Sequence, residues 1–274
     1  FTLCAVVILL FGSSCANDLP KAQVLDRLRV LALIATTPEV LPGATVTVTP
    51  VVSDVRGAGR ALSYTVEACY DPGLDYGADV SCSHDTAKVT VGATAVTLTA
   101  PRYTQAVTTF NITVPSALFT TAQVDALTQF NGANYLVIFT LTAADGEIEQ
   151  VFRRIKVSGA SKISKNQNPS LTGFKKSDGT AVAALPTEET ALLAVAPSTA
   201  AEAYSELNTN GSFEARTETL TVSWFASEGL PELTLQAIDS PNTYAPATTP
   251  TYSPFVAAVV RDERGGAGVL LLTP

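Results

Sequence analysis

Residues that support metal binding and acid-base catalysis are scarce in this chain of 274 residues. It has no methionine, four cysteines and a single histidine, His84, and only 15% of its residues are charged. One histidine excludes a histidine cluster as a metal site and leaves few options for histidine-dependent proton transfer. The sequence has no Gly-x-Ser-x-Gly motif, and the glycine-rich segment 265–268 lacks the lysine of a phosphate-binding loop. We therefore expect no catalytic activity and no cofactor.

Basic residues are also too few and too scattered for nucleic-acid binding. The formal net charge is −8 and the sequence pI is about 4.7. Binding to phosphate backbones needs clustered lysine and arginine, which the sequence does not contain, so we expect no nucleic-acid partner. Alanine, valine, leucine and threonine are abundant instead, and this composition favours β-sheets with buried faces.

The first fifteen residues have the pattern of an export signal. An apolar run of seven residues, 5–11, precedes Gly12-Ser13-Ser14-Cys15. The run is shorter than the roughly 20 residues of a membrane-spanning helix and suits the core of a signal peptide. Its ending resembles the lipobox of bacterial lipoproteins, which implies cleavage before Cys15 and lipidation of Cys15. An ordinary signal peptide, or a buried strand with an incidental cysteine, stays open as an alternative. With neither methionine nor a basic residue before the run, we interpret Phe1 as a truncated start.

Two cysteines remain for the exported domain if Cys4 leaves with the signal and Cys15 carries lipid. These are Cys69 and Cys82, and an exported chain with one remaining pair is expected to join them in a disulfide. A metal pair is the alternative, but His84 is the only histidine and no second pair of ligands occurs at a suitable spacing.

Strand-like patterns recur along the rest of the sequence. Residues 44–52 alternate valine with threonine, as in a half-buried strand, and a hairpin signal at Asp145-Gly146 joins two apolar segments. The expected strands of the first half are 28–35, 44–52, 62–69, 88–91, 95–99, 105–114, 135–143 and 148–157. Those of the second half are 190–196, 217–226, 233–238, 255–261 and 267–272. One helix is predicted within 116–130, with Thr121 as its cap.

The pattern divides the chain into two similar halves. Residues 158–168 are small and polar, which predicts a boundary there. The expected organisation is a signal peptide (1–14), a lipidated tether (15–27), a first sandwich (28–158), a linker (159–168) and a second sandwich (169–274). Leu62-Ser63-Tyr64 has a counterpart in Val222-Ser223-Trp224, and each half ends with a hairpin. These similarities between the halves indicate a duplicated β module.

The core tryptophan and the closing hairpin resemble tandem immunoglobulin-like or PKD-like β-sandwich domains. Trp224 and the segment 259–266 carry this resemblance in the second half, and Tyr64 stands at the tryptophan position in the first. The whole chain is similar to uncharacterised outer-membrane lipoproteins of myxobacterial type, through its Cys-Ala-Asn start, its Leu-Pro-Gly strand and its Ala-Cys-Tyr-Asp-Pro-Gly loop. The resemblance implies an all-β protein of two tandem sandwiches, anchored in the outer membrane at the periplasmic face or the cell surface, and the one short helix predicted in the first domain departs from the standard pattern. It implies no activity.

Long loops provide the candidate binding residues. Tyrosine is a residue type that binding surfaces favour, and four tyrosines lie in the cysteine loop and in the proline-rich segment 241–254: Tyr70, Tyr76, Tyr244 and Tyr252. A core role for these tyrosines is the alternative. Calcium binding at Asp178-Gly179 or at Asp262-Glu263 also stays open, because both turns carry hard oxygens.

These observations favour a lipid-anchored, non-catalytic envelope protein that binds a protein or glycan partner in recognition or adhesion. The first alternative is a stoichiometric structural or accessory subunit of a larger envelope complex. The second is a secreted-type hydrolase, which would need a pocket with converging polar groups.

Overall fold

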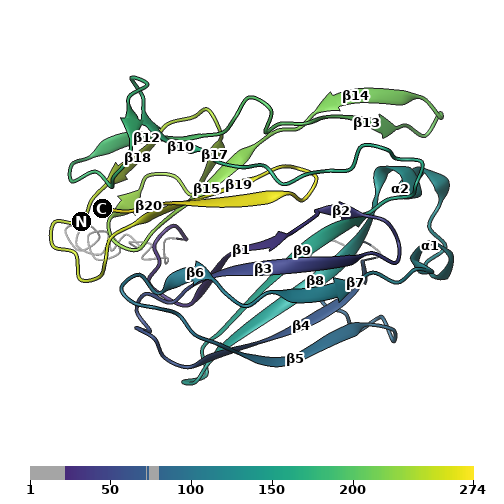
Figure 1. The fold of residues 1–274 in the computed structure, drawn as a ribbon, viewed down its shortest axis with the longest axis horizontal. Coiled ribbons are helices and arrows are strands. Elements are labelled where there is room, and N and C mark those ends of the chain that lie inside the picture. Colours follow the sequence, from purple (N-terminus) through teal and green to yellow (C-terminus); the bar gives the residue numbers. More distant parts are fainter. Residues whose placement is uncertain (1–21, 72, 74–79) are drawn as a thin grey trace, which may run out of the picture.

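The chain folds into two β-sandwiches that follow one another along the sequence (Figure 1). The computed structural model describes residues 22–71, 73 and 80–274. Within these residues almost all regular structure is β, so the predicted fold class is confirmed. No helix of the described residues is long and apolar enough to span a membrane.

The first sandwich pairs a sheet made of its early strands with a sheet made of its late ones. One sheet contains β1 (Arg29–Ala35), β3 (Thr45–Ser53), β6 (Thr104–Ala106) and β7 (Phe110–Thr113). The other has the order β2 (Glu39–Val40), β9 (Ile148–Val157), β8 (Ala133–Ala143), β4 (Leu62–Asp71) and β5 (Val89–Val96). The pairings are antiparallel except that of β2 with β9.

The second sandwich repeats this arrangement. One sheet has the order β11 (Ala181–Val182), β10 (Gly173–Lys176), β12 (Thr190–Val195), β18 (Asn242–Ala245) and β16 (Leu230–Pro231). The other has the order β17 (Leu235–Ala237), β15 (Thr221–Ala226), β19 (Val256–Arg261) and β20 (Ala267–Leu272). A separate hairpin of β13 (Ala203–Leu207) and β14 (Phe213–Thr217) is inserted between β12 and β15.

The strand order is that of immunoglobulin-like domains. In both sandwiches the first, second and fifth core strands (A, B, E) share one sheet, and the third, sixth and seventh (C, F, G) share the other. Strand C is β4 in the first sandwich and β15 in the second. Tyr64 and Trp224 lie on these strands and are buried in the two cores, so the predicted correspondence between them is confirmed.

A third core joins the two sandwiches. Strand β19 is buried on both faces: Val256, Ala258 and Val260 point into the second sandwich, whereas Ala257 and Val259 point out of it toward the first. The outward residues and Phe255 pack against apolar residues of the first sandwich and the segment that leads into it, namely Leu25, Leu31, Ala32, Val51 and Val55. Strand side chains alternate between faces, so an unbroken apolar run suits a strand with a core on each side.

The predicted helix at 116–130 is two short helices. These are α1 (Leu118–Thr121) and α2 (Ala126–Asn131). The chain turns between them with a positive φ of 51° at Gln123, and Asp125, not Thr121, is the N-cap that accepts a hydrogen bond from Thr128 N. The one-helix prediction was wrong because the apolar spacing at 116–130 continues across this turn.

Two predicted strand boundaries also differ from the structure. Residues 88–91 and 95–99 belong to one strand, β5, in which Gly92 lies near an irregularity of the β4–β5 pairing rather than in a turn. The predicted strand at 105–114 is divided into β6 and β7, which both pair with β3.

The polar segments at either end of the first sandwich are partly buried. In the described part of the predicted tether, Leu25 belongs to the third core, and its backbone N–H donates to Ala226 of the second sandwich. In the predicted linker, Lys162 and Asn166 are buried. Polar residues of this segment are buried because the two sandwiches supply hydrogen-bond partners for them.

Candidate binding site at the joint between the sandwiches

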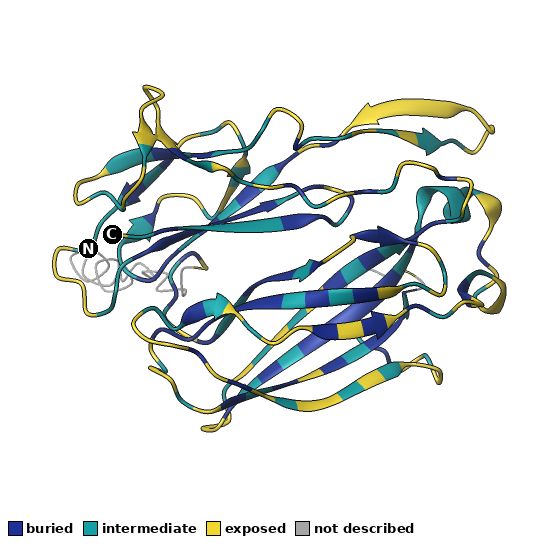
Figure 2. Cartoon of the chain, in the orientation of Figure 1, coloured by how far each residue is buried: buried dark blue, intermediate teal, exposed yellow. Residues whose placement is uncertain are grey.

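The inserted hairpin β13–β14, residues 203–217, forms an arm that projects from the second sandwich. Gly211 has a φ of 81°, a conformation that glycine adopts without strain, and lies in the turn between the two strands. Strand β14 is exposed along its whole length, as Figure 2 shows. In Figure 1 the arm lies at the upper right, above α2 of the first sandwich.

The arm is fixed to the first sandwich at α2. The side-chain amide of Asn131 donates to the carbonyl of Leu207 and accepts from its N–H, both at 2.8 Å. The rings of Phe130 and Phe213 pack beside this contact, with 5.1 Å between their centroids. The arm is therefore held on one edge by a residue of the other domain.

Ionic contacts between the sandwiches lie beneath the arm. Glu39, buried on β2, binds Lys162 Nζ and Arg264 Nη2, each at 2.9 Å. It also accepts hydrogen bonds from Ser158 Oγ and the backbone N–H of Asn166. We call this group of five residues the Glu39 clasp. It contains residues of the first sandwich, the linker and the second sandwich, so it holds the joint together.

The electrostatics of the clasp favour the ionised carboxylate. Burial acts to raise the pKa of Glu39, but hydrogen bonds from Ser158, Lys162 and Asn166 N together outweigh burial, and the pKa is lowered. Arg264 additionally binds the buried carboxylate of Glu218 at 3.0 Å and lies over the ring of Tyr204, 4.5 Å from its centroid. Glu202 lies 3.7 Å from the same guanidinium, so the cation on Arg264 is shared between three carboxylates and an aromatic face.

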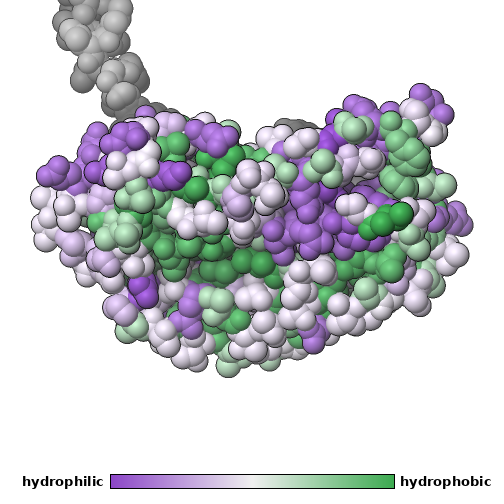
Figure 3. All heavy atoms as spheres, turned by 45° about the horizontal axis from the view of Figure 1, so that its top comes forward, coloured by the Kyte–Doolittle hydropathy of each residue, from purple (hydrophilic) through white to green (hydrophobic). Residues whose placement is uncertain are grey.

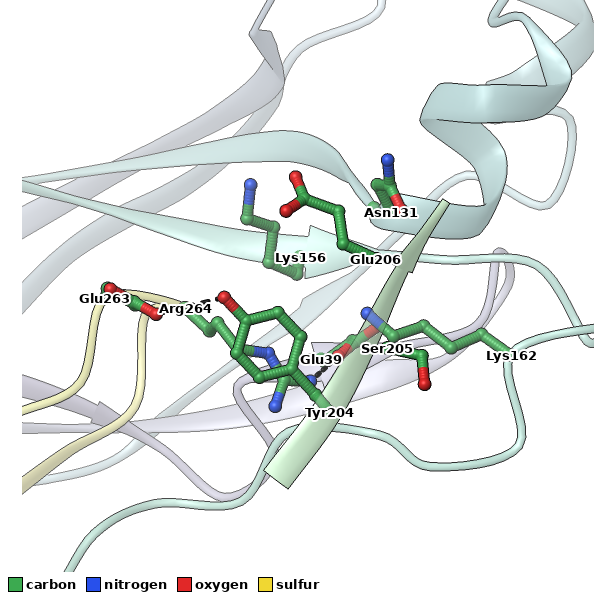
Figure 4. Close-up of a pocket in the computed structure, with 10 residues that line it drawn as sticks. Glu39, Asn131, Lys156, Lys162, Tyr204, Ser205, Glu206, Glu263 and Arg264 are labelled. Atoms are coloured by element: carbon green, nitrogen blue, oxygen red, sulfur yellow. Dashed lines mark hydrogen bonds and ion pairs between the residues drawn. The ribbon is translucent and has the colours of Figure 1, made fainter. Parts of the chain in front are cut away.

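A polar pocket of about 210 Å³ lies between the clasp and the arm (Figure 4). Tyr204 crosses one side of it, and its hydroxyl donates to Glu263 at 3.0 Å. Burial, and after it the hydrogen bond to Glu263, raises the pKa of Tyr204 to about 12. Lys156 and Glu206 line the other side, and burial lowers the pKa of Lys156. Lys156 forms no salt bridge within the described part of the chain.

An apolar groove of about 510 Å³ runs along the other face of the arm. Ile163 of the linker is 94% exposed and Phe213 of the arm is 63% exposed, and both line the groove with Phe130. Figure 3 shows polar side chains gathered on the right-hand part of one face of the molecule, with hydrophobic ones beside them. Large exposed apolar side chains that line one groove are typical of an interaction surface.

Comparisons with known proteins give no family. No family model and no curated protein matches the chain. Among solved structures, red sea bream transglutaminase has 11% identity and a TM-score of 0.29, with 90% of this chain and 31% of that one covered. The chicken CNTN1 FN1–FN3 domains have 10% identity and a TM-score of 0.23 (89% and 64% covered), and the D0–D1 domain of intimin has 10% and 0.24 (89% and 99% covered). This chain spans about a third of the transglutaminase, and its immunoglobulin-like strand order follows from its own hydrogen-bond ladders.

The predicted disulfide is present, and it belongs to the first sandwich, whereas the arm belongs to the second. Cys69 and Cys82 are bonded and fully buried against Leu136 and Ile138 on the outer face of the β4–β8 pair. His84 follows them in an exposed loop, with Nε2 2.9 Å from the carbonyl oxygen of Tyr70. The lipidation residue Cys15 and the candidate Tyr76 lie outside the described residues.

The other predicted tyrosines have roles in packing. Tyr244 is buried in the second core and donates its hydroxyl to Glu228 O, which corrects the prediction of an exposed binding residue. Tyr252 is half-buried beside the third core, under the guanidinium of Arg56, and Tyr70 packs against the first core. Loop length did not reveal that β18 runs through the proline-rich segment and carries Tyr244 into the sandwich.

Calcium binding at the two aspartate turns would need a cluster of oxygen ligands. The described residues contain no group of three or more His, Cys, Asp and Glu side chains placed to hold a metal. The carboxylate of Asp262 accepts from Arg264 N, Gly266 N and Asn166 Nδ2, and Asp178 accepts from Thr180 N. Both aspartates organise their own turns.

The arm was not predicted from the sequence, although the residues of its turn are typical of a hairpin. Asn210-Gly211 between two segments of strand-forming residues is a typical hairpin turn. The clasp has no comparable signal, because its residues are far apart in the sequence: Glu39 and Arg264 are separated by 225 positions.

Proposed function

We propose that the protein is a non-catalytic binding protein of the bacterial cell envelope, which holds an extended segment of a partner protein along the arm. The observation that carries the proposal is the free edge of β14. This strand pairs only with β13 among the described residues, and it borders the apolar groove that contains Phe213 and Ile163.

The pairing of the arm determines which backbone groups face that edge. Asn208 N donates to Ser212 O and Glu218 N to Glu202 O, and hydrogen-bonded pairs alternate with non-bonded pairs along an antiparallel ladder. Phe213, Ala215 and Thr217 therefore lie at non-bonded positions, with their N–H and C=O groups directed away from β13. On β13 the equivalent outward groups of Leu207 are occupied by Asn131, whereas those of β14 remain open to another strand.

Variants of the arm test this proposal. A photo-crosslinking residue at position 213 should capture a partner in cells, and one at Ile148 should not. Ile148 is the matched control because it is 62% exposed but lies on β9, away from the arm. Ala215→Pro removes one outward N–H and should weaken capture while leaving the β13–β14 ladder intact. Equal crosslinking at both positions, or capture that Ala215→Pro does not change, would contradict the proposal.

The same experiment separates a binding protein from a permanent subunit. A partner recovered in variable amounts and released by Ala215→Pro supports a binding role. A partner that co-purifies at a fixed stoichiometry would support the alternative, a stoichiometric subunit of a larger envelope complex.

The proposed location is the outer membrane, through a lipid on Cys15. The support is the apolar run 5–11 and the small residues that precede this cysteine. Expressed with an added initiator methionine and basic residues before the apolar run, the chain should incorporate an alkyne-labelled fatty acid and fractionate with membranes. Cys15→Ser should abolish both, whereas Cys4→Ser, the matched control, should change neither. Labelling that survives in Cys15→Ser would exclude this anchor.

A further inference from the structure

A second groove, on the side of the joint where β1, β9 and β20 meet, contains two arginines that have no carboxylate partner among the residues that the structure describes. Arg153 lies on β9 and Arg261 at the end of β19, so the groove has one arginine from each sandwich. Neither forms a salt bridge within the described residues. We call this the arginine groove.

Both arginines are held by neutral oxygens. Arg153 donates from its two terminal nitrogens to the carbonyls of Leu33 and Gly265. Arg261 donates to Ser223 Oγ at 2.8 Å and to Leu31 O at 2.9 Å. These bonds orient the guanidinium groups but do not neutralise their charge.

The positive charge of Arg153 is energetically unfavourable at its buried position. Its side chain is only 8% exposed, and its Nε is buried without a hydrogen-bond partner. Burial lowers the pKa of Arg153 to about 10, and burial also lowers the pKa of Arg261. Asp262 is the carboxylate that acts on Arg153, but its oxygens already accept three hydrogen bonds, from Arg264 N, Gly266 N and Asn166 Nδ2. A buried cation of this kind is stabilised by an anion that reaches it.

The walls of the arginine groove are apolar. The groove has a volume of about 310 Å³ and is lined by side chains of Val30, Leu31, Leu33, Val151 and Phe152. Phe152 is 47% exposed, and together with Gln150 it also lines an adjoining hollow that leads to Val80 and Ile138. The arginine groove therefore continues along the surface of β9 into a hollow that also contains the polar residues Ser81 and Gln150.

We propose that the arginine groove binds an aliphatic monocarboxylate, with its carboxylate on Arg153 and Arg261 and its chain against Val30, Leu31 and Phe152. A planar carboxylate matches the forked donors of guanidinium, and an aliphatic chain matches the apolar walls. The volume is at the lower end of the range for ligand pockets, which suits a small ligand. This site is separate from the arm and does not depend on the proposed partner.

Calorimetric titration of the folded protein with octanoate, octanol and inorganic phosphate tests the proposal. Octanoate should bind at one site, and octanol and phosphate should each bind at least tenfold more weakly. Arg261→Gln should weaken octanoate binding at least tenfold. Arg216→Gln is the matched control, because Arg216 lies on the exposed arm, and it should leave octanoate binding unchanged.

Val30→Trp serves as a second variant, since it fills the arginine groove while both arginines stay in place. Val30 is only partly buried, so the larger side chain can be accommodated more readily than at a core position. Val30→Trp should abolish octanoate binding, and it decides the question if Arg261→Gln does not fold. Octanol or phosphate binding as tightly as octanoate, or octanoate binding that both variants retain, would overturn the proposal.

Discussion

The side chain of Asn131 takes the place of a neighbouring strand for Leu207. Its amide oxygen and nitrogen each form a 2.8 Å hydrogen bond with the backbone of Leu207, on the outer edge of β13. One residue of the first sandwich thus closes one edge of the arm of the second. Within the described residues β14 has no second partner strand, and this asymmetry gives the arm a single side for pairing.

Asn131→Ala should release the arm. The two lost hydrogen bonds contribute about 1 kcal/mol each, so the variant should stay folded while the backbone amides of 203–217 exchange faster with solvent. Hydrogen-deuterium exchange measured by mass spectrometry checks this. Asn111→Ala is the matched control, because Asn111 is an exposed asparagine that bonds to Thr47 on the first sandwich. Unchanged exchange in the arm would show that Asn131 does not hold it.

Glu39→Gln should destabilise the protein strongly. The neutral amide would leave Lys162 buried without its counter-ion and deprive Arg264 of one of its carboxylates, and breaking buried pairs costs about 3–5 kcal/mol. Chemical denaturation measures the free energy of unfolding. In Glu67→Gln, the matched control, the lost partner is the exposed Lys88, and the expected loss is below about 1 kcal/mol. Losses of similar size in both variants would argue against the clasp.

The contribution of Glu39 should disappear in acid. Its pKa in the folded protein lies below the ordinary value of 4.5, so between these two values the unfolded chain binds more protons than the folded one. The stability that Glu39 provides is complete above pH 4.5 and is lost as the pH falls through the lowered pKa. The difference in unfolding free energy between wild type and Glu39→Gln should therefore shrink below pH 4.5.

Glu149 and Glu218 have the opposite effect on how the free energy of unfolding depends on pH. Burial raises the pKa of both carboxyl groups, so protonation at these sites favours the folded state as the pH falls. Comparison with Glu39→Gln cancels the contribution of Glu149, because both proteins retain it, whereas Glu218 shares Arg264 with Glu39 and responds to the substitution. A difference that stays constant from pH 6 to pH 3 would contradict the assignment of a lowered pKa to Glu39.

The third core should make the two sandwiches unfold together. Phe255 is fully buried between them, and Phe255→Ala should lower the unfolding free energy by about 3–5 kcal/mol. Differential scanning calorimetry should show one transition in wild type, shifted to lower temperature in the variant. Phe213→Ala, at an exposed phenylalanine of the arm, should shift the transition temperature little. Two separate transitions in wild type would show that the sandwiches are independent.

Much of the fold could be predicted because it depends on local alternation. Residues 44–52 alternate between valine and threonine and form β3, and the apolar segments around Asp145-Gly146 form the β8–β9 hairpin. The match between Tyr64 and Trp224 was visible because each lies at an inward position of a short alternating strand. The disulfide Cys69–Cys82 followed from the count of cysteines.

The candidate site could be predicted only in small part. Tyrosines in long loops were expected to bind, but Tyr244 points into the second core because the segment around it pairs as β18 with β12. Ile163 and Phe213 were not singled out, since isolated apolar residues in polar segments have no periodicity that marks them. Their proximity depends on how the arm docks on α2.

The sequence by itself determined the β-strands, the duplicated sandwich and the disulfide, because alternation and cysteine count act within short stretches of chain. The tertiary structure alone decided which charges are buried and which edges stay open. Glu39 and Arg264 look like ordinary surface residues in the sequence, and so does Arg153. They become a buried clasp and an unpaired cation because the two sandwiches meet along β1 and β20, and solvent leaves the space between them. The energy of a charge depends on that removal of solvent and on the partners that replace it, and both are fixed by residues distant in the chain.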